Sequence, residues 1–542
     1  MRSDSWWEGP SETLSEDDGK LSDAVKDVRR PVTIVEQTGR PLFSTSGRVS
    51  IQGSAPSGKA LPVRGMIAAL GLSNLGDPEF LRDHGICFPY VGGSMAHGIS
   101  STAISNALGQ AGMLGFIGTA GQSPQWVEEA IVKMQSASPA IPYGFNLINS
   151  PNEPNLEQAL VDLYIRRGVH LIEASAYLAI TLPLVRFRLS GIRRGPDGEV
   201  VAPNRIIGKV SRVEVASKFF SPPPEKFVKE MVSRGELNPE QARMAAEIPM
   251  SQDITAEADS GGHTDNRPLV CLLPSFLALR TRLQAQFSYP FALRVGAAGG
   301  VASPQAAAGA FAMGAAYIVV GSVHQSCRES GTSEFVREML AQAGQADVAM
   351  APAGDMFEMG VNVQVLKRGT MFPMRAKKLY ELYISHQRIE DIPLADRENI
   401  EKNFFRAPLS QIWEQTRQFF MKRDPTQVER AEKDPKHLMA LVFRWYLGHS
   451  PKWAIAGDLT RKLDFQVWCG PAMGSFNEWV KGSHLESHKN RGVADVAMNL
   501  MYGAAVGLRA ATLRAQGVAL PAICFDVRPL PHEALKNLLE GA

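Results

Sequence analysis

The chain has 542 residues, of which 44% are hydrophobic and 21% charged, with a formal net charge of +2. This composition is typical of a soluble globular protein, and the length is too great for one ordinary core, so we expect one large domain with additions. The net charge argues neither for nor against nucleic acid, but no strongly basic tract is present, and we predict no nucleic-acid partner.

The cysteines and the apolar segments indicate compartment. Five cysteines are widely spaced without a CxxC pair, which favours reduced thiols in a cytoplasmic protein over a disulfide framework or a zinc site. No His/Asp/Glu cluster has ligand spacing, so we predict no metal. The N-terminus lacks the apolar core of a secretion signal. The small-residue run Val493–Ala515 is interrupted by charges and is predicted to be a buried helix, so we expect no membrane segment.

The first 85 residues divide into two parts. Residues 1–28 are low in branched apolar residues and are predicted to be disordered. Residues 29–85 are expected to form a small N-terminal β/α element with strands at Pro31–Glu36 and Arg48–Gln52.

From Phe88 onward, eight apolar runs are each followed by a helical pattern, which predicts parallel strands joined by right-handed crossovers. Eight such units predict an α/β fold of the (β/α)8 TIM barrel type over residues 86–330. An open doubly wound sheet is the alternative, disfavoured because no GxGxxG follows an early strand. The expected strands are Phe88–Gly92, Met113–Ile117, Tyr143–Leu147, His170–Ala174, Arg205–Val210, Asp253–Ala258, Leu293–Ala297 and Ala316–Val320.

Two insertions interrupt the barrel pattern, and a helical region follows it. Residues 188–204 predict a hairpin turned at Pro196-Asp197-Gly198, and residues 222–250 contain a helix capped by Asn238 that we expect near the barrel mouth. Residues 331–520 are predicted to form a helical cap that binds substrate, and residues 521–542 a C-terminal tail. The expected helices are Ser333–Gln342, Met374–Ile384, Glu398–Phe405, Leu409–Arg423, Pro435–Leu447 and Val493–Gln516.

Two glycine-containing turns follow the last two predicted strands, Gly299-Gly300 and Gly321-Ser322. Turns at these two places present backbone N–H groups side by side, and in (β/α)8 barrels they commonly form a phosphate site. Ordinary turns are the alternative reading.

Further candidates lie at the ends of the other predicted strands. Lys209 could place a positive charge near an anionic ring system, or form a salt bridge within the mouth. Asn146 could hydrogen-bond ring edges or phosphate, or be a turn residue. His97 could be a site residue or a helix cap. His263 follows two flexible glycines and can change protonation near neutral pH, or it could belong to a structural turn and cap a helix. The predicted cofactor-binding residues are Met95, Ala96, Asn146, Lys209, Gly261, Gly262, Gly299, Gly300, Gly321 and Ser322.

Six short motifs, at 95–98 (MAHG), 144–147, 208–210, 258–263 (ADSGGH), 296–301 and 319–322, resemble flavin barrels of the nitronate monooxygenase (2-nitropropane dioxygenase) type. That group also contains bacterial flavin-dependent enoyl reductases. Asp259-Ser260 departs from the Glu-Ala usual before GGH. The longer stretches 248–268 and 467–482 (VWCGPAMGSFNEWVKG) resemble the trans-acting enoyl reductases of polyunsaturated fatty acid synthases and polyketide synthases.

The resemblance implies FMN as cofactor, NADPH as reductant and an enoyl thioester on an acyl carrier protein as substrate, with His263 as the catalytic residue. It leaves open whether the chain forms a homodimer. A nitronate oxidase on the same barrel and a flavin-free scaffold protein of a synthase are the alternatives. The basic run 367–378, with Lys367, Arg368, Arg375, Lys377 and Lys378, is either a solvated face or a docking site for an acidic carrier.

Overall fold

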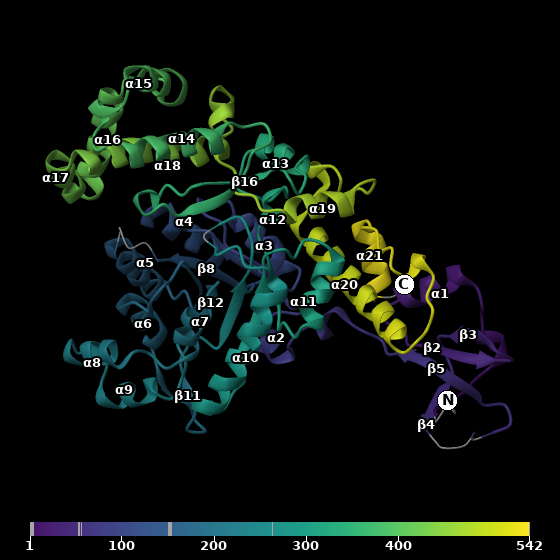
Figure 1. The fold of residues 1–542 in the computed structure, drawn as a ribbon. Coiled ribbons are helices and arrows are strands. Elements are labelled where there is room, and N and C mark those ends of the chain that lie inside the picture. The colour runs from purple at the N-terminus through teal and green to yellow at the C-terminus, as the bar shows by residue number, and fades with distance from the viewer. Residues whose placement is uncertain (1–4, 52–54, 56, 150–153, 263, 541–542) are drawn as a thin grey trace.

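The computed structural model describes residues 5–540 except 52–54, 56, 150–153 and 263. Its centre is a closed barrel of eight parallel strands (Figure 1), which confirms the predicted (β/α)8 fold and all eight predicted strands. The strands, in order around the barrel, are β6 (Tyr90–Gly92), β7 (Leu114–Ile117), β8 (Tyr143–Ile148), β9 (Leu171–Ser175), β12 (Arg205–Val210), β13 (Asp253–Glu257), β14 (Arg294–Ala298) and β15 (Ile318–Val320).

Seven helices follow the first seven strands, and several begin at a Ser or Thr whose side chain accepts a backbone N–H of the first turn, with proline at the first or second helical position. These signals lie within the first turn of each helix and can be read from the sequence. The seven are α3 (Thr102–Gln110), α4 (Pro124–Gln135), α5 (Pro154–Arg166), α6 (Leu182–Leu189), α7 (Val213–Phe220), α10 (Leu269–Phe287) and α11 (Pro304–Ala312).

The eighth barrel helix is α20 (Val493–Ala515), which packs against α11 and α3. The expectation that the barrel ends near residue 330 is therefore wrong, because the chain leaves after β15 and returns to complete the ring. Small residues permit this close packing, since a Cβ at Gly503 would lie 2.6 Å from the Pro304 ring. Among the described residues, α20 is the one helix long and apolar enough to cross a membrane, but 72% of that window is buried inside the protein.

One end of the barrel is closed by α2 (Pro78–His84). The Phe80 ring stacks on Tyr317 with ring centroids 4.1 Å apart, and His84 hydrogen-bonds to Asp253 at 2.9 Å. Arg294 completes this plug with a 2.6 Å ion pair to the same carboxylate. Because side chains fill the interior from this end, a ligand can enter only where the strands have their carboxyl ends.

The first insertion forms the predicted hairpin of β10 (Arg193–Arg194) and β11 (Val200–Val201). The second contains α8 (Glu225–Ser233) and α9 (Pro239–Ala245), and Asn238 forms the predicted cap. Its expected position near the mouth is wrong. Helix α7 carries the chain back to the opposite end of the barrel, so α8 and α9 lie beside the hairpin (Figure 1), where Glu247 pairs with Arg194 at 2.5 Å.

The N-terminal residues form a five-stranded sheet in the order β3-β2-β5-β1-β4. Disorder over residues 1–28 is therefore a wrong expectation for 5–28, since Trp7 is 2% exposed, donates from Nε1 to the Ser46 carbonyl at 2.8 Å, and belongs to the first strand. The few apolar residues here are buried against other elements rather than against one another. The elements are β1 (Ser5–Glu8), α1 (Asp18–Lys26), β2 (Val32–Gln37), β3 (Arg40–Ser44), β4 (Arg48–Ile51) and β5 (Leu61–Ile67).

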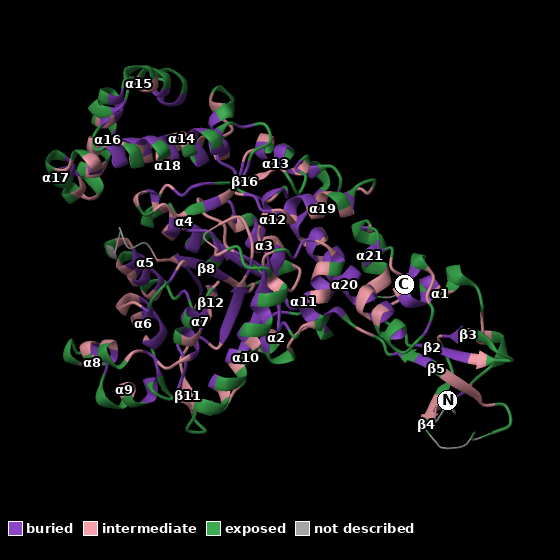
Figure 2. Ribbon diagram, in the orientation of Figure 1, coloured by how far each residue is buried: buried purple, intermediate pink, exposed green. Residues whose placement is uncertain are grey.

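A lobe inserted between β15 and α20 covers the mouth of the barrel, because connections that follow a barrel strand lie at its carboxyl end (Figure 1). It has its own apolar core, and its outer face is exposed (Figure 2). Its predicted helices are present, joined by a hairpin that was not predicted. The lobe elements are β16 (Val348–Pro352), β17 (Asn362–Leu366), α14 (Phe372–Ser385), α15 (Leu394–Ile400), α16 (Leu409–Arg423), α17 (Pro425–Lys433) and α18 (Pro435–Ala456).

Short elements connect the lobe to the barrel at both ends, and one helix ends the described chain. The expected C-terminal tail contains this last helix, which buries Leu535. The elements are α12 (Ser322–Gln325), α13 (Glu334–Ala341), α19 (Ala472–Val480) and α21 (His532–Glu540).

Candidate active site

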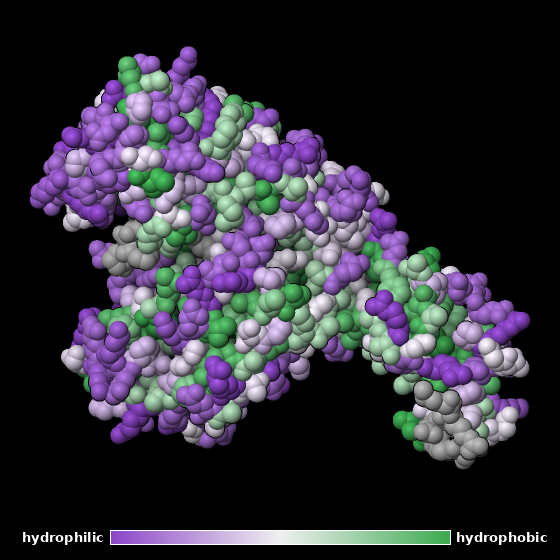
Figure 3. Space-filling model, in the orientation of Figure 1, coloured by the Kyte–Doolittle hydropathy of each residue, from purple (hydrophilic) through white to green (hydrophobic). Residues whose placement is uncertain are grey.

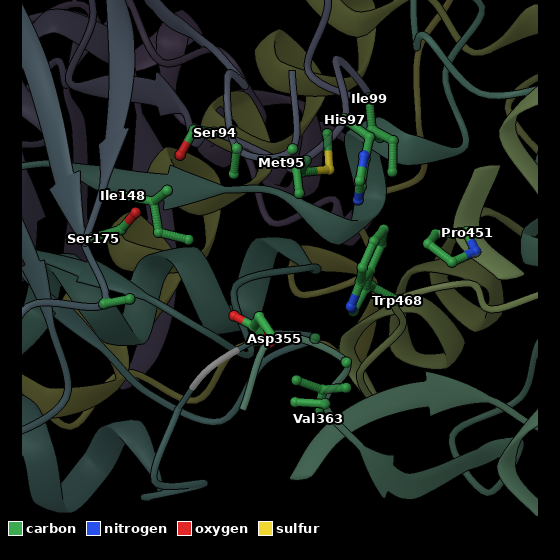
Figure 4. Close-up of a pocket in the computed structure, with 18 of the residues that line it drawn as sticks. Ser94, Met95, His97, Ile99, Ile148, Ser175, Asp355, Val363, Pro451 and Trp468 are labelled. Atoms are coloured by element: carbon green, nitrogen blue, oxygen red, sulfur yellow. The ribbon is translucent and has the colours of Figure 1, made fainter. Parts of the chain in front are cut away.

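A cavity of about 630 Å³ lies between the carboxyl ends of the barrel strands and the lobe. The molecular surface is hollowed between these two parts (Figure 3), and a close-up shows side chains from both (Figure 4). The structure brings all ten predicted cofactor-binding residues to this one cavity, whereas His263 lies outside the described residues. The ten are Met95, Ala96, Asn146, Lys209, Gly261, Gly262, Gly299, Gly300, Gly321 and Ser322.

The two glycine turns present bare backbone to the cavity. Gly299 and Gly300 have φ angles of +85° and +76°, which side chains rarely adopt. A Cβ at Gly300 would meet no atom within 4 Å, and one at Gly321 would meet only Met95 Cγ at 4.0 Å. Since both positions line the cavity, the protein leaves room there for a group bound to backbone N–H donors.

Gly261 allows the loop after β13 to approach the segment that returns from the lobe. A Cβ at Gly261 would lie 2.9 Å from the backbone nitrogen of Cys469. Gly262, by contrast, has open space around its Cβ position. The loop that leads to His263 is therefore fixed at one glycine and unobstructed at the next.

Lys209 forms the salt bridges that were one of its two predicted roles. Its Nζ lies 3.4 Å from Glu173 Oε2 and 3.3 Å from Glu257 Oε1, on the two neighbouring strands. Burial alone would lower the pKa of Lys209, but the two carboxylates raise it above its usual value. The ammonium therefore stays charged while it lines the cavity. Glu173 Oε1 has no hydrogen-bond partner among the described residues, although its side chain is only 1% exposed.

Asn146 is a strand residue rather than a turn residue. Its Nδ2 donates to the Glu173 carbonyl at 3.1 Å and to Ser175 Oγ at 2.8 Å. Its own carbonyl accepts from Thr119 Oγ1 and from Tyr164 OH, each at 2.7 Å. The two side-chain hydrogen bonds fix the orientation of the Asn146 amide at the edge of the cavity, and the two bonds to its backbone carbonyl hold the strand there.

His97 contacts the lobe across the cavity. Its ring stacks on Trp468, with centroids 5.6 Å apart and planes 17° apart (Figure 4). The pKa of His97 is lowered to about 4, first by burial and then by the charge of Lys452, against an opposing effect of Asp355. The sequence left His97 as either a site residue or a helix cap, and Trp468 was not predicted as a site residue. His97 lies in the motif at 95–98 and Trp468 in the stretch at 467–482.

The outer part of the cavity lies under two helices of the lobe. Helices α16 and α18 each line it with one face, and α5 lies on the barrel side. This face of the lobe was not predicted as a site, although Gly448 and Pro451 within an otherwise helical pattern were a visible signal. The lobe residues are Gln415, Thr416, Phe419, Phe420, Arg423, Leu441, Arg444, Trp445, Leu447, Gly448, His449, Pro451 and Lys452.

The basic run 367–378 does not form one surface. Arg375 is buried and pairs with Asp464, while Lys378 pairs with Asp396 at 2.9 Å. Arg375 therefore cannot belong to a docking face, whereas Lys367, Arg368 and Lys377 are exposed. The described residues also contain no group of three or more His, Cys, Asp or Glu side chains placed to hold a metal ion.

Two family models and a solved crystal structure match the chain. The family model for nitronate monooxygenase matches residues 79–381, and the model for the inserted helical domain of [acyl-carrier-protein] S-malonyltransferase matches residues 386–465. The crystal structure of the enoyl reductase domain of MlnA, from the macrolactin biosynthesis cluster of Bacillus amyloliquefaciens, is similar with a TM-score of 0.77 and 40% identity. That match covers 82% of this chain and 99% of the other.

Two curated relatives are longer than this chain. One component of the polyunsaturated fatty acid synthase of Thraustochytrium sp. is 45% identical over 477 residues, which cover 87% of this chain and 32% of that protein. Polyketide biosynthesis protein PksE from Bacillus subtilis is 41% identical over 444 residues, which cover 82% of this chain and 58% of that protein. The chain therefore spans less than two thirds of either relative.

The fold and the cavity define a (β/α)8 barrel with a small-molecule site at the carboxyl ends of its strands, covered by a helical lobe. The nitronate monooxygenase model matches more than half of the chain, and a solved structure is 40% identical to it. These two matches assign the chain to a family. The chain belongs to the nitronate monooxygenase family and, within it, to the enoyl reductases of polyunsaturated fatty acid and polyketide synthases.

Proposed function

We propose that this protein is an FMN-dependent enoyl reductase that uses NADPH to reduce the 2,3 double bond of enoyl thioesters carried on an acyl carrier protein, which it serves in trans. The observation that carries the proposal is the meeting of two bare glycine turns and a buried lysine in one cavity. The relatives support the substrate class, since their names are those of polyunsaturated fatty acid and polyketide synthesis.

The residues present fit FMN. Backbone N–H groups at Gly300 and Gly321 would bind its phosphate, where a Cβ would otherwise fill the available space. Lys209 would hold a positive charge near the ring system, kept in place by its two carboxylate partners. The chemistry that FMN supplies when bound is hydride transfer from NADPH to the β-carbon of the enoyl thioester.

The chain's own residues orient the reactants and move the proton. Lys209 remains charged, so it stabilises negative charge that develops beside it. The lobe covers the mouth and limits the access of water. Ser260, Gly261 and Gly262 line the cavity directly before His263, which we propose delivers a proton to the α-carbon or a hydrogen bond to the thioester oxygen.

The purified protein tests this proposal directly. We expect flavin absorption bands, and NADPH oxidation under anaerobic conditions that depends on an added 2-enoyl thioester. A colourless protein that cannot be reconstituted with FMN would instead indicate a scaffold protein. Oxygen consumption with a nitroalkane, without enoyl-dependent NADPH oxidation, would support a nitronate oxidase, a second candidate favoured by the family model over residues 79–381.

A further inference from the structure

On the lobe side of the cavity, a strip of the α18 backbone around Gly448 is not covered by side chains. Gly448 lines the cavity, and a Cβ there would meet no atom within 4 Å. Pro451 lies inside the helix and has no N–H, so the carbonyl of Leu447, four residues earlier, lacks its helical donor. Leu447 and Pro451 both line the cavity as well. This part of the helix therefore offers a backbone acceptor and space instead of side chains.

Helix α16 faces this strip with an apolar ring and a cation. Phe419 is 49% exposed although it lines the cavity, and the Arg423 guanidinium lies 5.6 Å from the centre of its ring. Both residues are on the face of α16 that also presents Gln415 to the cavity. A ligand with an apolar group beside an anion would pack on the Phe419 ring and form an ion pair with the Arg423 guanidinium.

Lys452 adds a second cation beside Arg423. Its pKa is lowered, first by burial and then by the charge of Arg423, so the two like charges are near each other. Among the described residues, the groups that shift the pKa of Lys452 include no carboxylate. The charge of Lys452 also reaches His97 in the inner part of the cavity. Asp355 also lines the cavity and its charge opposes that of Lys452 at His97. Arg423 and Lys452 are the pair of cations that a phosphate group in the outer part of the cavity would contact.

We propose that the strip of Gly448, Pro451 and Lys452, with Phe419 and Arg423 opposite, binds the phosphopantetheine arm of a carrier-bound thioester, an inference that rests on the proposed enoyl reductase function. The arm carries amide N–H groups, a gem-dimethyl group and a terminal phosphate. An amide N–H donates to the Leu447 carbonyl, the methyl groups pack on the Phe419 ring, and the phosphate pairs with the two cations.

NADPH is a second source of phosphate, so the test must separate the two. We would compare one enoyl group on phosphopantetheine, on pantetheine without phosphate, and on N-acetylcysteamine. Lys452→Gln is expected to raise KM roughly 10-fold for the phosphopantetheine thioester and to leave KM unchanged for the other two. Lys452→Arg is expected to retain wild-type values. Lys422→Gln, which removes an exposed cation of α16 outside the cavity, is the matched control.

A second variant tests the backbone strip independently of charge. Gly448→Leu places a side chain in the cavity, and leucine forms helices better than glycine. We therefore expect an unchanged or higher Tm together with weaker binding of both pantetheine thioesters. A lower Tm with unchanged KM values would contradict the proposed role of Gly448.

Three results would overturn the proposal. If Lys452→Gln raises KM for NADPH but not for NADH, the phosphate that Lys452 binds belongs to the dinucleotide. If the variant raises KM equally for all three thioesters, Lys452 does not bind the phosphate of phosphopantetheine. The third measurement is the equilibrium binding of a saturated acyl-phosphopantetheine to wild type and Lys452→Gln, which can be determined without turnover. Wild-type protein that reduces no enoyl thioester defeats the proposed function, whereas turnover with binding insensitive to Lys452 defeats only this inference.

Discussion

His97 and Trp468 are stacked across the active-site cavity, one from the barrel and the other from the segment that returns from the lobe. The other face of the imidazole lies against the barrel, since a Cβ at Gly121 would be 2.3 Å from His97 Cε1. The ring is thus held between the two parts of the protein. Its protonation state is therefore coupled to the packing of the lobe on the barrel.

This coupling predicts how stability depends on pH. His97 has a pKa of about 4 in the folded protein against an ordinary value of 6.5. A lowered pKa contributes stability that is complete above pH 6.5 and is lost as pH falls toward 4, at most about 3 kcal/mol before allowance for partial exposure. Urea unfolding of His97→Asn between pH 7 and 4 should show a smaller loss than wild type. Parallel curves would contradict the coupling.

The salt bridges of Lys209 predict an interaction that a double-mutant cycle can measure. Lys209→Met leaves Glu173, with 1% of its side chain exposed, beside Glu257 without a cation. We expect a loss of about 3–5 kcal/mol in the free energy of unfolding. Lys209→Met combined with Glu173→Gln should recover part of that loss, because the buried negative charge is removed. Glu173→Gln alone completes the cycle, and a double variant whose loss equals the sum of the two single losses would show that Lys209 and Glu173 are not coupled.

The glycine cradle can be tested where the backbone is not strained. Gly321 has a φ of −121°, and a Cβ there has only Met95 Cγ at 4.0 Å, so alanine is compatible with the fold. We expect Gly321→Ala to keep the wild-type Tm and to weaken FMN binding by roughly 10-fold, through contact with the bound phosphate. Gly309→Ala, in helix α11 with nothing within 4 Å, is the control and should bind FMN normally. Full flavin occupancy in Gly321→Ala would remove this turn from the cradle.

Arg509 joins helix α1 and the segments next to the N-terminal sheet to the barrel. Its buried guanidinium on α20 donates to the carbonyls of Ala24, Val25, Arg30 and Ala68, at 2.5–3.1 Å. Arg509→Met leaves these acceptors without a charged donor, which we expect to cost about 3 kcal/mol or more. The measurements are urea unfolding and limited proteolysis of residues 5–68. The exposed Arg514→Met is the control, and equal protease resistance in both variants would contradict the anchoring role.

The features that sequence reasoning found are those with local causes. The eight strands and the turns at Gly300 and Gly321 were predictable because apolar runs and glycines act within a few residues. The features that it missed depend on partners distant in the chain. Glu173 is recognised as a site residue only through its salt bridge with Lys209 on the neighbouring strand. Arg375, expected in a surface patch, is buried because Asp464 lies beneath it.

Chain connectivity explains the remaining errors. Val493–Ala515 was expected to be a buried helix, and it is one, but its place as the eighth helix of the barrel requires knowing that the whole lobe is inserted before it. The position of α1 likewise depends on α20 from the other end of the chain, whereas β1 is ordered by pairing with β4 and β5. An amphipathic or small-residue pattern shows that a helix is covered, but not which element covers it.

The role of His263 is the prediction that bears most directly on catalysis. Hydride addition to the β-carbon leaves negative charge on the thioester oxygen and the α-carbon, and a positioned imidazole can protonate or hydrogen-bond it. His263→Ala should keep bound flavin and normal reduction of the enzyme by NADPH, while reoxidation by the enoyl thioester slows roughly 10²–10⁴-fold. Stopped-flow measurement of the two half-reactions separates the outcomes. A selective defect in reduction would assign His263 to NADPH binding, and unchanged rates in both with a lower Tm would assign it a purely structural role.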